Sequence, residues 1–265
     1  MKVAAVEGDQ QYLNEIRDAW SSCRPLERNR RGQDKLVSMK LVAKSDGSVV
    51  DLTLPDPAGE SFSDQWELGR CLPDYVTLGR EASGLLLFVN PGRIEAGLSI
   101  RDVVRAAEAA RGGAASAEPA VEPRPWSPQS AGTQVQLVEL IQTLRRPPMG
   151  RSYLPVAIIV SAWDQLLGPE GSPSEQLTPE EWLAQALPLL AQYLEMNTEV
   201  FPSRIYGVSA QGGDLARDRA RLLDEPSPWK RVMIVGPDCD AHDLTAPLRW
   251  LLKMADPDNR GKATT

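Results

Sequence analysis

The chain has 265 residues, 42% of them hydrophobic, which is enough to bury the core of one large domain. Its 36 acidic residues outnumber its 29 basic ones, and the net charge of -7 excludes broad electrostatic attraction to nucleic acid or to an anionic membrane. It contains neither an apolar run of about 18 residues nor a secretory signal pattern. We therefore expect a cytoplasmic globular protein with no nucleic acid or membrane partner.

Thiols and imidazoles are too few for a zinc site. The three cysteines, Cys23, Cys71 and Cys239, are far apart in the sequence, and His242 is the single histidine. We expect three reduced thiols, and a histidine that flanks the last helix rather than acting as a base.

The N-terminal third predicts a helix followed by a β-hairpin. After Asp9, apolar residues recur three or four positions apart, which places them on one helical face. They are Leu13, Ile16, Trp20 and Cys23. Two alternating stretches follow, Lys35 to Val42 and Val49 to Leu54, joined through an Asp-Gly turn at positions 46–47.

The remaining sequence alternates between apolar strands and amphipathic helices. Strands are expected at 84–90, 156–160, 204–208 and 232–235, and helices from Ser99, over 133–145, after Thr178 and over 244–254. Thr178-Pro179-Glu180-Glu181 has the spacing of a capping box, and Pro188 should bend the helix that it starts. Residues 112–132 predict a flexible insertion and 256–265 a disordered tail.

This βα alternation predicts a three-layer α/β domain over residues 1–255, with a mostly parallel sheet and one antiparallel hairpin. Parallel sheets bind ligands at the carboxyl ends of their strands. Polar loops follow three of the expected strands. They are Asp56-Pro57-Ala58-Gly59-Glu60, Ser161-Ala162-Trp163-Asp164 and Ser209-Ala210-Gln211.

In order and placement these loops resemble the motifs of Ras-like, translation-factor-related (TRAFAC) P-loop GTPases, specifically the divergent bacterial branch of double-GTPase proteins. The resemblance spans Asp9 to Ala255 and implies GTP or GDP with Mg²⁺ as ligands. It makes Asp56 a magnesium-orienting carboxylate that acts through water and Gly59 a close neighbour of the terminal phosphate. Glu60 then occupies the catalytic position that glutamine often fills, where its charge would repel phosphate oxygens.

The resemblance assigns guanine recognition to the other two loops. Asp164 would accept two hydrogen bonds from the base, beside Ser161, and a backbone N–H of Ser209-Ala210 would meet the guanine carbonyl. Ala162 and Gln211 stand where the family has lysines. Without the resemblance, the Asp56 loop is an ordinary turn and Asp164 a helix cap or turn residue.

The family's phosphate-binding sequence, Gly-x-x-x-x-Gly-Lys-Ser/Thr, does not occur. Either an upstream segment supplies its strand and loop, or residues 2–6 or 232–235 fill the centre of the sheet; we favour the first. We expect a truncated or degenerate GTPase-like domain that does not hydrolyse GTP alone. The alternative is a non-catalytic pseudo-GTPase scaffold that binds a protein partner in a bacterial multi-component or conflict system.

Overall fold

The computed structural model describes residues 1–8, 10–25, 35–43, 47–56, 67–97, 104, 130–167 and 177–256. The expected helix from Ser99 and the expected insertion at 112–132 lie outside this part, apart from Val104 and residues 130–132, as does the tail beyond Asp256. No helix in the described part is long and apolar enough to cross a membrane.

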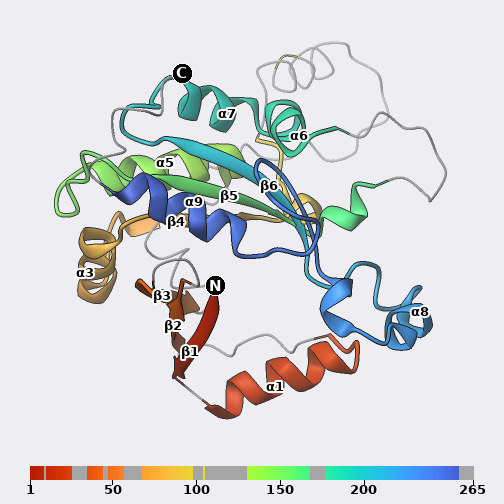
Figure 1. Ribbon diagram of the computed structural model, residues 1–265. Helices are drawn as coiled ribbons and strands as arrows, with labels where there is room; N and C mark the ends of the chain where they lie inside the picture. The colour runs from red at the N-terminus through yellow and green to blue at the C-terminus, as the bar shows by residue number, and fades with distance from the viewer. Residues whose placement is uncertain are drawn as a thin grey trace.

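A four-stranded sheet forms the centre of the molecule, in the order β4-β5-β6-β7 (Figure 1). Its strands are β4 (Leu85–Val89), β5 (Val156–Ser161), β6 (Ser203–Ser209) and β7 (Met233–Val235). The first three are parallel, and β7 runs antiparallel to β6. The predicted α/β class with a mostly parallel sheet is confirmed.

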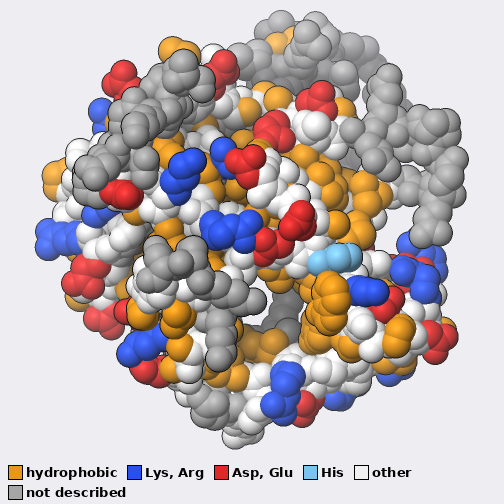
Figure 2. Space-filling model, in the orientation of Figure 1, with side chains coloured by type: hydrophobic (Ala, Val, Ile, Leu, Met, Phe, Trp, Pro, Cys, Tyr) orange, Lys and Arg blue, Asp and Glu red, His pale blue; other side chains and the backbone are white. Residues whose placement is uncertain are grey.

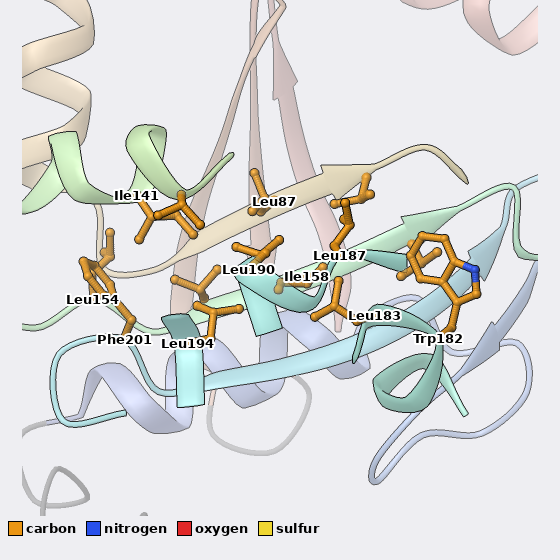
Figure 3. Packing of buried hydrophobic residues seen from close by; sticks show 14 of the residues in the cluster. Leu87, Ile141, Leu154, Ile158, Trp182, Leu183, Leu187, Leu190, Leu194 and Phe201 are labelled. Atoms are coloured by element: carbon orange, nitrogen blue, oxygen red, sulfur yellow. The ribbon is translucent and has the colours of Figure 1, made fainter. Parts of the chain in front are cut away.

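Alternating side chains of β5 divide the core into two layers. Val156, Ile158 and Val160 pack under α5 (Thr133–Arg145), α6 (Pro179–Ala186) and α7 (Pro188–Glu195), and Figure 3 shows leucines of α6 and α7 meeting Ile158. Ala157 and Ile159 face the opposite side, where α9 (Ala246–Ala255) covers them. Because both faces of β5 are buried, its sequence is continuously apolar.

Local sequence signals set the ends of α6. Thr178 accepts a hydrogen bond from the Glu181 N–H, and the Glu181 carboxylate accepts one from the Thr178 N–H, which completes the predicted capping box. Pro188 lacks the N–H that would continue the helix, so α6 ends at Ala186 and α7 starts at Pro188. The expected bend is thus a break between two helices.

A second, antiparallel sheet has the order β1-β2-β3. It comprises β1 (Lys2–Glu7), β2 (Lys35–Val42) and β3 (Val49–Asp56). The predicted hairpin forms with Val42 opposite Val49, and Gly47 takes a left-handed φ of 73° in its turn. β1 pairs with β2 and is followed by α1 (Gln10–Ser21).

The main sheet differs from one of the arrangements that the sequence leaves open. Neither residues 2–6 nor 232–235 fill its centre, because β1 belongs to the other sheet and β7 adds to the far edge of β6. β4 is an edge strand, and one of its faces is partly open at Phe88. Phe88 is 59% exposed, and β4 pairs only with β5 among the described residues, since it forms an edge of the sheet.

Shorter elements complete the described chain. They are α3 (Pro73–Glu81), α8 (Arg219–Asp224), and the 3-10 helices η1 (Pro91–Arg93), η3 (Trp163–Gln165) and η4 (Pro228–Arg231). In Figure 1, α3 lies near the start of the parallel strands, while α8 lies beyond their carboxyl ends, close to the last turn of α1.

Candidate functional site at the carboxyl ends of the parallel strands

The loops after β5 and β6 lie side by side. The two strands are parallel, and Ser161 at the end of β5 is opposite Val208 of β6. The carboxyl ends of β5 and β6 therefore lie at the same edge (Figure 1), where Ser161 and Asp164 end or follow one strand and Ser209 and Ala210 the other. This is the edge at which parallel sheets hold ligands.

Ser161 ties this edge to the end of β4. Its Oγ donates a hydrogen bond to the Val89 carbonyl oxygen at 3.1 Å. In the next turn, the Asn90 side chain accepts a hydrogen bond from the Gly92 N–H at 2.9 Å. The Ser161 hydroxyl proton is thus engaged within the protein, and the residue holds two strand ends together.

Asp164 follows a buried residue that positions the turn after β5. Ala162 adopts a left-handed conformation, with φ 52° and ψ 42°, and turns the chain into η3. Trp163 is buried and meets Trp182 edge-on, with ring centroids 6.4 Å apart. The half-buried Asp164 carboxylate forms no hydrogen bond or ion pair with any other residue in the described ranges.

The loop after β6, residues 209–212, is here named the base loop. Ser209 is fully buried, and its Oγ accepts a hydrogen bond from the Gly212 N–H at 2.8 Å. Gly212 has φ 71°, and a Cβ there would lie 2.3 Å from the Arg231 carbonyl oxygen, so only glycine fits. Ala210 is exposed, and its carbonyl accepts a hydrogen bond from Trp20 Nε1 at 2.8 Å.

The magnesium half of the expected site is not brought to this edge by any described contact. Asp56 is the last residue of β3 and pairs with Lys35 in the three-stranded sheet. Gly59 and Glu60 lie outside the described residues. Within the described ranges, no group of three His, Cys, Asp or Glu side chains could hold a metal ion. The structure thus gathers four of the predicted site residues, namely Ser161, Asp164, Ser209 and Ala210.

A family model described as Double-GTPase 1 matches residues 1–251. The chain belongs to the Double-GTPase 1 family. This places it in a GTPase-related family, in line with the resemblance that the three loops carry. Searches of curated proteins and of solved structures returned no match.

In this Double-GTPase 1 chain, charges beside the base loop are mixed. Hydrogen bonds to Asp218 are the largest cause of a raised pKa for Arg217, and the negative charges of Asp214 and Asp164 add to it. Arg221 donates to the Gly212 carbonyl oxygen at 3.0 Å. Asp164 therefore lies within electrostatic reach of a guanidinium without being paired to it.

His242 takes no part in the candidate site. Its Nδ1 is 2.6 Å from the Val232 carbonyl oxygen, and its ring meets Trp229 edge-on at 5.6 Å between centroids. Figure 2 shows this single pale-blue side chain beside hydrophobic ones. It lies between β7 and α9, as expected for a histidine that flanks the last helix. Within the described residues, Cys23, Cys71 and Cys239 form no disulfide.

Sequence reasoning missed two residues that support the base loop of this Double-GTPase 1 chain. The apolar period places Trp20 on the buried face of the first helix, and no local pattern singles out Arg231. Trp20 binds a carbonyl 190 positions away, and the Arg231 guanidinium lies 4.3 Å from the centre of its ring. Periodicity gives the exposed or buried face of a helix but not its distant partner.

Proposed function

We propose that this chain is a guanine-nucleotide-binding domain in which Asp164 and the base loop recognise the purine. The supporting observation is the Asp164 carboxylate, which has no polar partner among the described residues and stands beside the base loop at the carboxyl edge of β5 and β6. Guanine presents two adjacent N–H donors, which a carboxylate accepts as a bidentate, charge-assisted pair. Membership of a GTPase-related family agrees with this assignment.

The phosphates and Mg²⁺ are assigned to the loop after β3 and to a phosphate loop that these 265 residues do not contain. Asp56 would orient the water shell of Mg²⁺, and Gly59 would let the backbone approach the terminal phosphate. The outer edge of β4, which pairs only with β5 among the described residues, offers a position for the strand that would carry a phosphate loop. Without that loop, and with Glu60 near the terminal phosphate, we propose that the chain does not hydrolyse GTP alone.

The second candidate function is a non-catalytic scaffold that uses the same fold to bind a protein partner. It is favoured by Ala162 and Gln211, which lack the lysine stems that pack on the base in related GTPases. It is also favoured by the engaged state of Ser161 and Ser209, whose hydroxyls bond within the protein.

Exchange of Asp164 for asparagine tests the base assignment. Asparagine offers one acceptor and one donor in place of two acceptors, so Asp164→Asn should weaken GDP binding by roughly 10- to 100-fold, the loss of about one charge-assisted hydrogen bond. Xanthine carries a carbonyl where guanine carries its amine, so the same variant should gain affinity for xanthosine diphosphate. Calorimetry with Mg²⁺ and each nucleotide at millimolar concentration measures both changes.

Asp74→Asn is the matched control, because Asp74 is exposed on α3, away from the carboxyl ends of the strands. It should bind both nucleotides as the parent chain does. Absence of any guanine nucleotide binding by the parent chain would reject the proposal in favour of the scaffold. Equal weakening of GDP and ATP by Asp164→Asn would show that the carboxylate does not read the base.

A further inference from the structure

The indole of Trp20 reaches from α1 to the base loop. Its Nε1 donates to the Ala210 carbonyl oxygen at 2.8 Å, although the two residues are 190 positions apart. Ala210 is exposed at the tip of the loop, so this carbonyl would otherwise bond to water. A second contact joins the same region to α8. Arg219 at the start of α8 donates a hydrogen bond to the Ser22 carbonyl oxygen at 3.4 Å.

A buried arginine fixes the indole in turn. The Arg231 guanidinium lies 4.3 Å from the centre of the Trp20 ring, within the range of a cation–π contact. Only 5% of Arg231 is exposed, and its Nη1 donates to Cys23 Sγ at 2.7 Å. The Arg231 carbonyl also packs against Gly212 at the end of the base loop. Trp20 and Arg231 therefore hold the loop from its two ends.

We propose that Trp20 is a positioning residue for the base loop, so that the docking of α1 sets the affinity for guanine. This inference rests on the proposed function. The Ala210 carbonyl and the Gln211 N–H belong to one planar trans peptide, and they point in opposite directions. Anchoring the carbonyl on the indole therefore restrains the peptide that joins Ala210 to Gln211, and with it the backbone of Ala210, whose own N–H is one of those proposed to meet the guanine carbonyl. The Gly212 N–H is already bound to Ser209 Oγ, so the loop is restrained at two successive points.

The Trp20–Ala210 hydrogen bond gives α1 a role in ligand binding that packing alone does not require. A loop that is ordered before the ligand arrives loses less conformational entropy on binding. Movement of α1 would release the Ala210 carbonyl and lower the affinity for the base. Trp20 contacts the loop and not the ligand. Removal of its hydrogen bond should therefore change guanine affinity and the local mobility of the loop.

Amide hydrogen exchange without nucleotide tests the restraint itself. Trp20→Phe keeps a six-membered aromatic ring near Arg231 but removes the indole N–H together with the five-membered ring that carries it. Exchange at positions 210–212 should become about 2- to 10-fold faster, which corresponds to one net hydrogen bond. Amide exchange in β5 should stay unchanged. General destabilisation of the fold would instead accelerate exchange in both the base loop and β5. Unchanged exchange in the loop, or equal acceleration in β5, overturns the proposal.

Trp229→Phe is the matched control. Trp229 lies in η4, near Arg231 in the sequence, but it is 58% exposed and packs on His242. The same substitution at this position should leave both amide exchange in the base loop and GDP affinity as they are in the parent chain. Acceleration in the base loop equal to that of Trp20→Phe would also overturn the proposal.

Calorimetry with Mg²⁺ and GDP then tests the consequence for binding. Trp20→Phe should weaken GDP by about 2- to 10-fold. If the parent chain binds GDP and Trp20→Phe binds it equally well, the positioning role is wrong while the proposed function stands. If the parent chain binds no guanine nucleotide, the proposed function fails, and the exchange rates alone decide whether Trp20 restrains the loop.

Discussion

At the scale of single residues, the candidate site depends on a tryptophan side chain that packs closely against a glycine backbone. Gly207 of β6 lies under the ring of Trp163, where a Cβ would come within 2.4 Å of a ring carbon. Trp163 is adjacent to Asp164 and is buried between this glycine and Trp182. The position of the proposed base-binding carboxylate therefore depends on a residue that contributes no side chain.

Gly207→Ala should displace the Trp163 ring and lower the free energy of unfolding by about 1–3 kcal/mol, as overpacking of a tight core does. Because Asp164 follows Trp163, GDP affinity should fall as well. Chemical denaturation and calorimetry measure the two effects. Gly79→Ala is the control, since its added Cβ would meet only the flexible Met149 side chain and alanine favours helix α3. Equal stability of the two variants would contradict this account of Trp163.

At the scale of elements, the start of α9 shows how one carboxylate organises a helix. Asp243 Oδ1 accepts from the Thr245 N–H at 3.0 Å and from Thr245 Oγ1 at 2.6 Å, and its Oδ2 accepts from Arg249. Burial alone would raise the pKa of Asp243, but the hydrogen bonds from Thr245 and Arg249 outweigh it and hold the pKa below its usual range.

This lowered pKa predicts a stability that depends on pH. The folded-state pKa lies below the unfolded one, so the contribution is fully present above the unfolded pKa of about 3.9 and is lost as pH falls through the folded value. Asp243→Asn should therefore lower the free energy of unfolding by about 1–2 kcal/mol at pH 7. The difference from the parent chain should shrink toward zero in acid. Urea denaturation across this range measures it.

Asp240→Asn serves as the control, because Asp240 is an exposed residue in the same connection between β7 and α9. The free energy of unfolding of Asp240→Asn should equal that of the parent chain at every pH. A constant deficit for Asp243→Asn at all pH values would mean that helix geometry, and not the ionised carboxylate, is responsible.

At the scale of the whole molecule, the described chain is two sheets linked by few polar contacts. The four-stranded sheet has helices on both faces, while the three-stranded sheet is a separate antiparallel unit. α1 and the two residues after it connect the sheets, because Trp20, Ser22 and Cys23 contact the base loop, α8 and η4. Under the proposed function, a nucleotide whose base is read by Asp164 and whose Mg²⁺ is oriented by Asp56 would join the two units.

A ligand that joins the units should stabilise the molecule as a whole. With Mg²⁺ and GDP at about 100 times the dissociation constant, the free energy of unfolding should rise by about 2.7 kcal/mol. For a chain of this size that corresponds to an increase in Tm of about 5–10 °C. Thermal denaturation followed by circular dichroism measures the shift. An equal shift with ATP at the same concentration would argue against guanine recognition, and no shift at saturation would argue against binding to the folded chain.

Much of the fold could be predicted because its signals are local. The capping box at Thr178, the break at Pro188 and the Asp-Gly turn each depend on residues within about one turn of each other in the sequence. The continuous apolar run of β5 likewise predicts burial on both faces. Part of the site follows from the same reasoning, since the ends of neighbouring parallel strands must meet, and this brings Asp164 beside Ser209.

The sequence by itself determined the hairpin, the strands of the main sheet and the helices that cover it, but not α3 or α8. It also determined their βα order and the two loops that end on one edge of the sheet, because hydrophobic period, caps and turns act over a few residues. Only the tertiary structure decided that β1 pairs with β2, that Phe88 stays exposed on an edge strand, and that Trp20 binds the Ala210 carbonyl. Such pairings join distant parts of the chain, and many partners satisfy the same local pattern. The choice among them follows from how all the surfaces fit together at once.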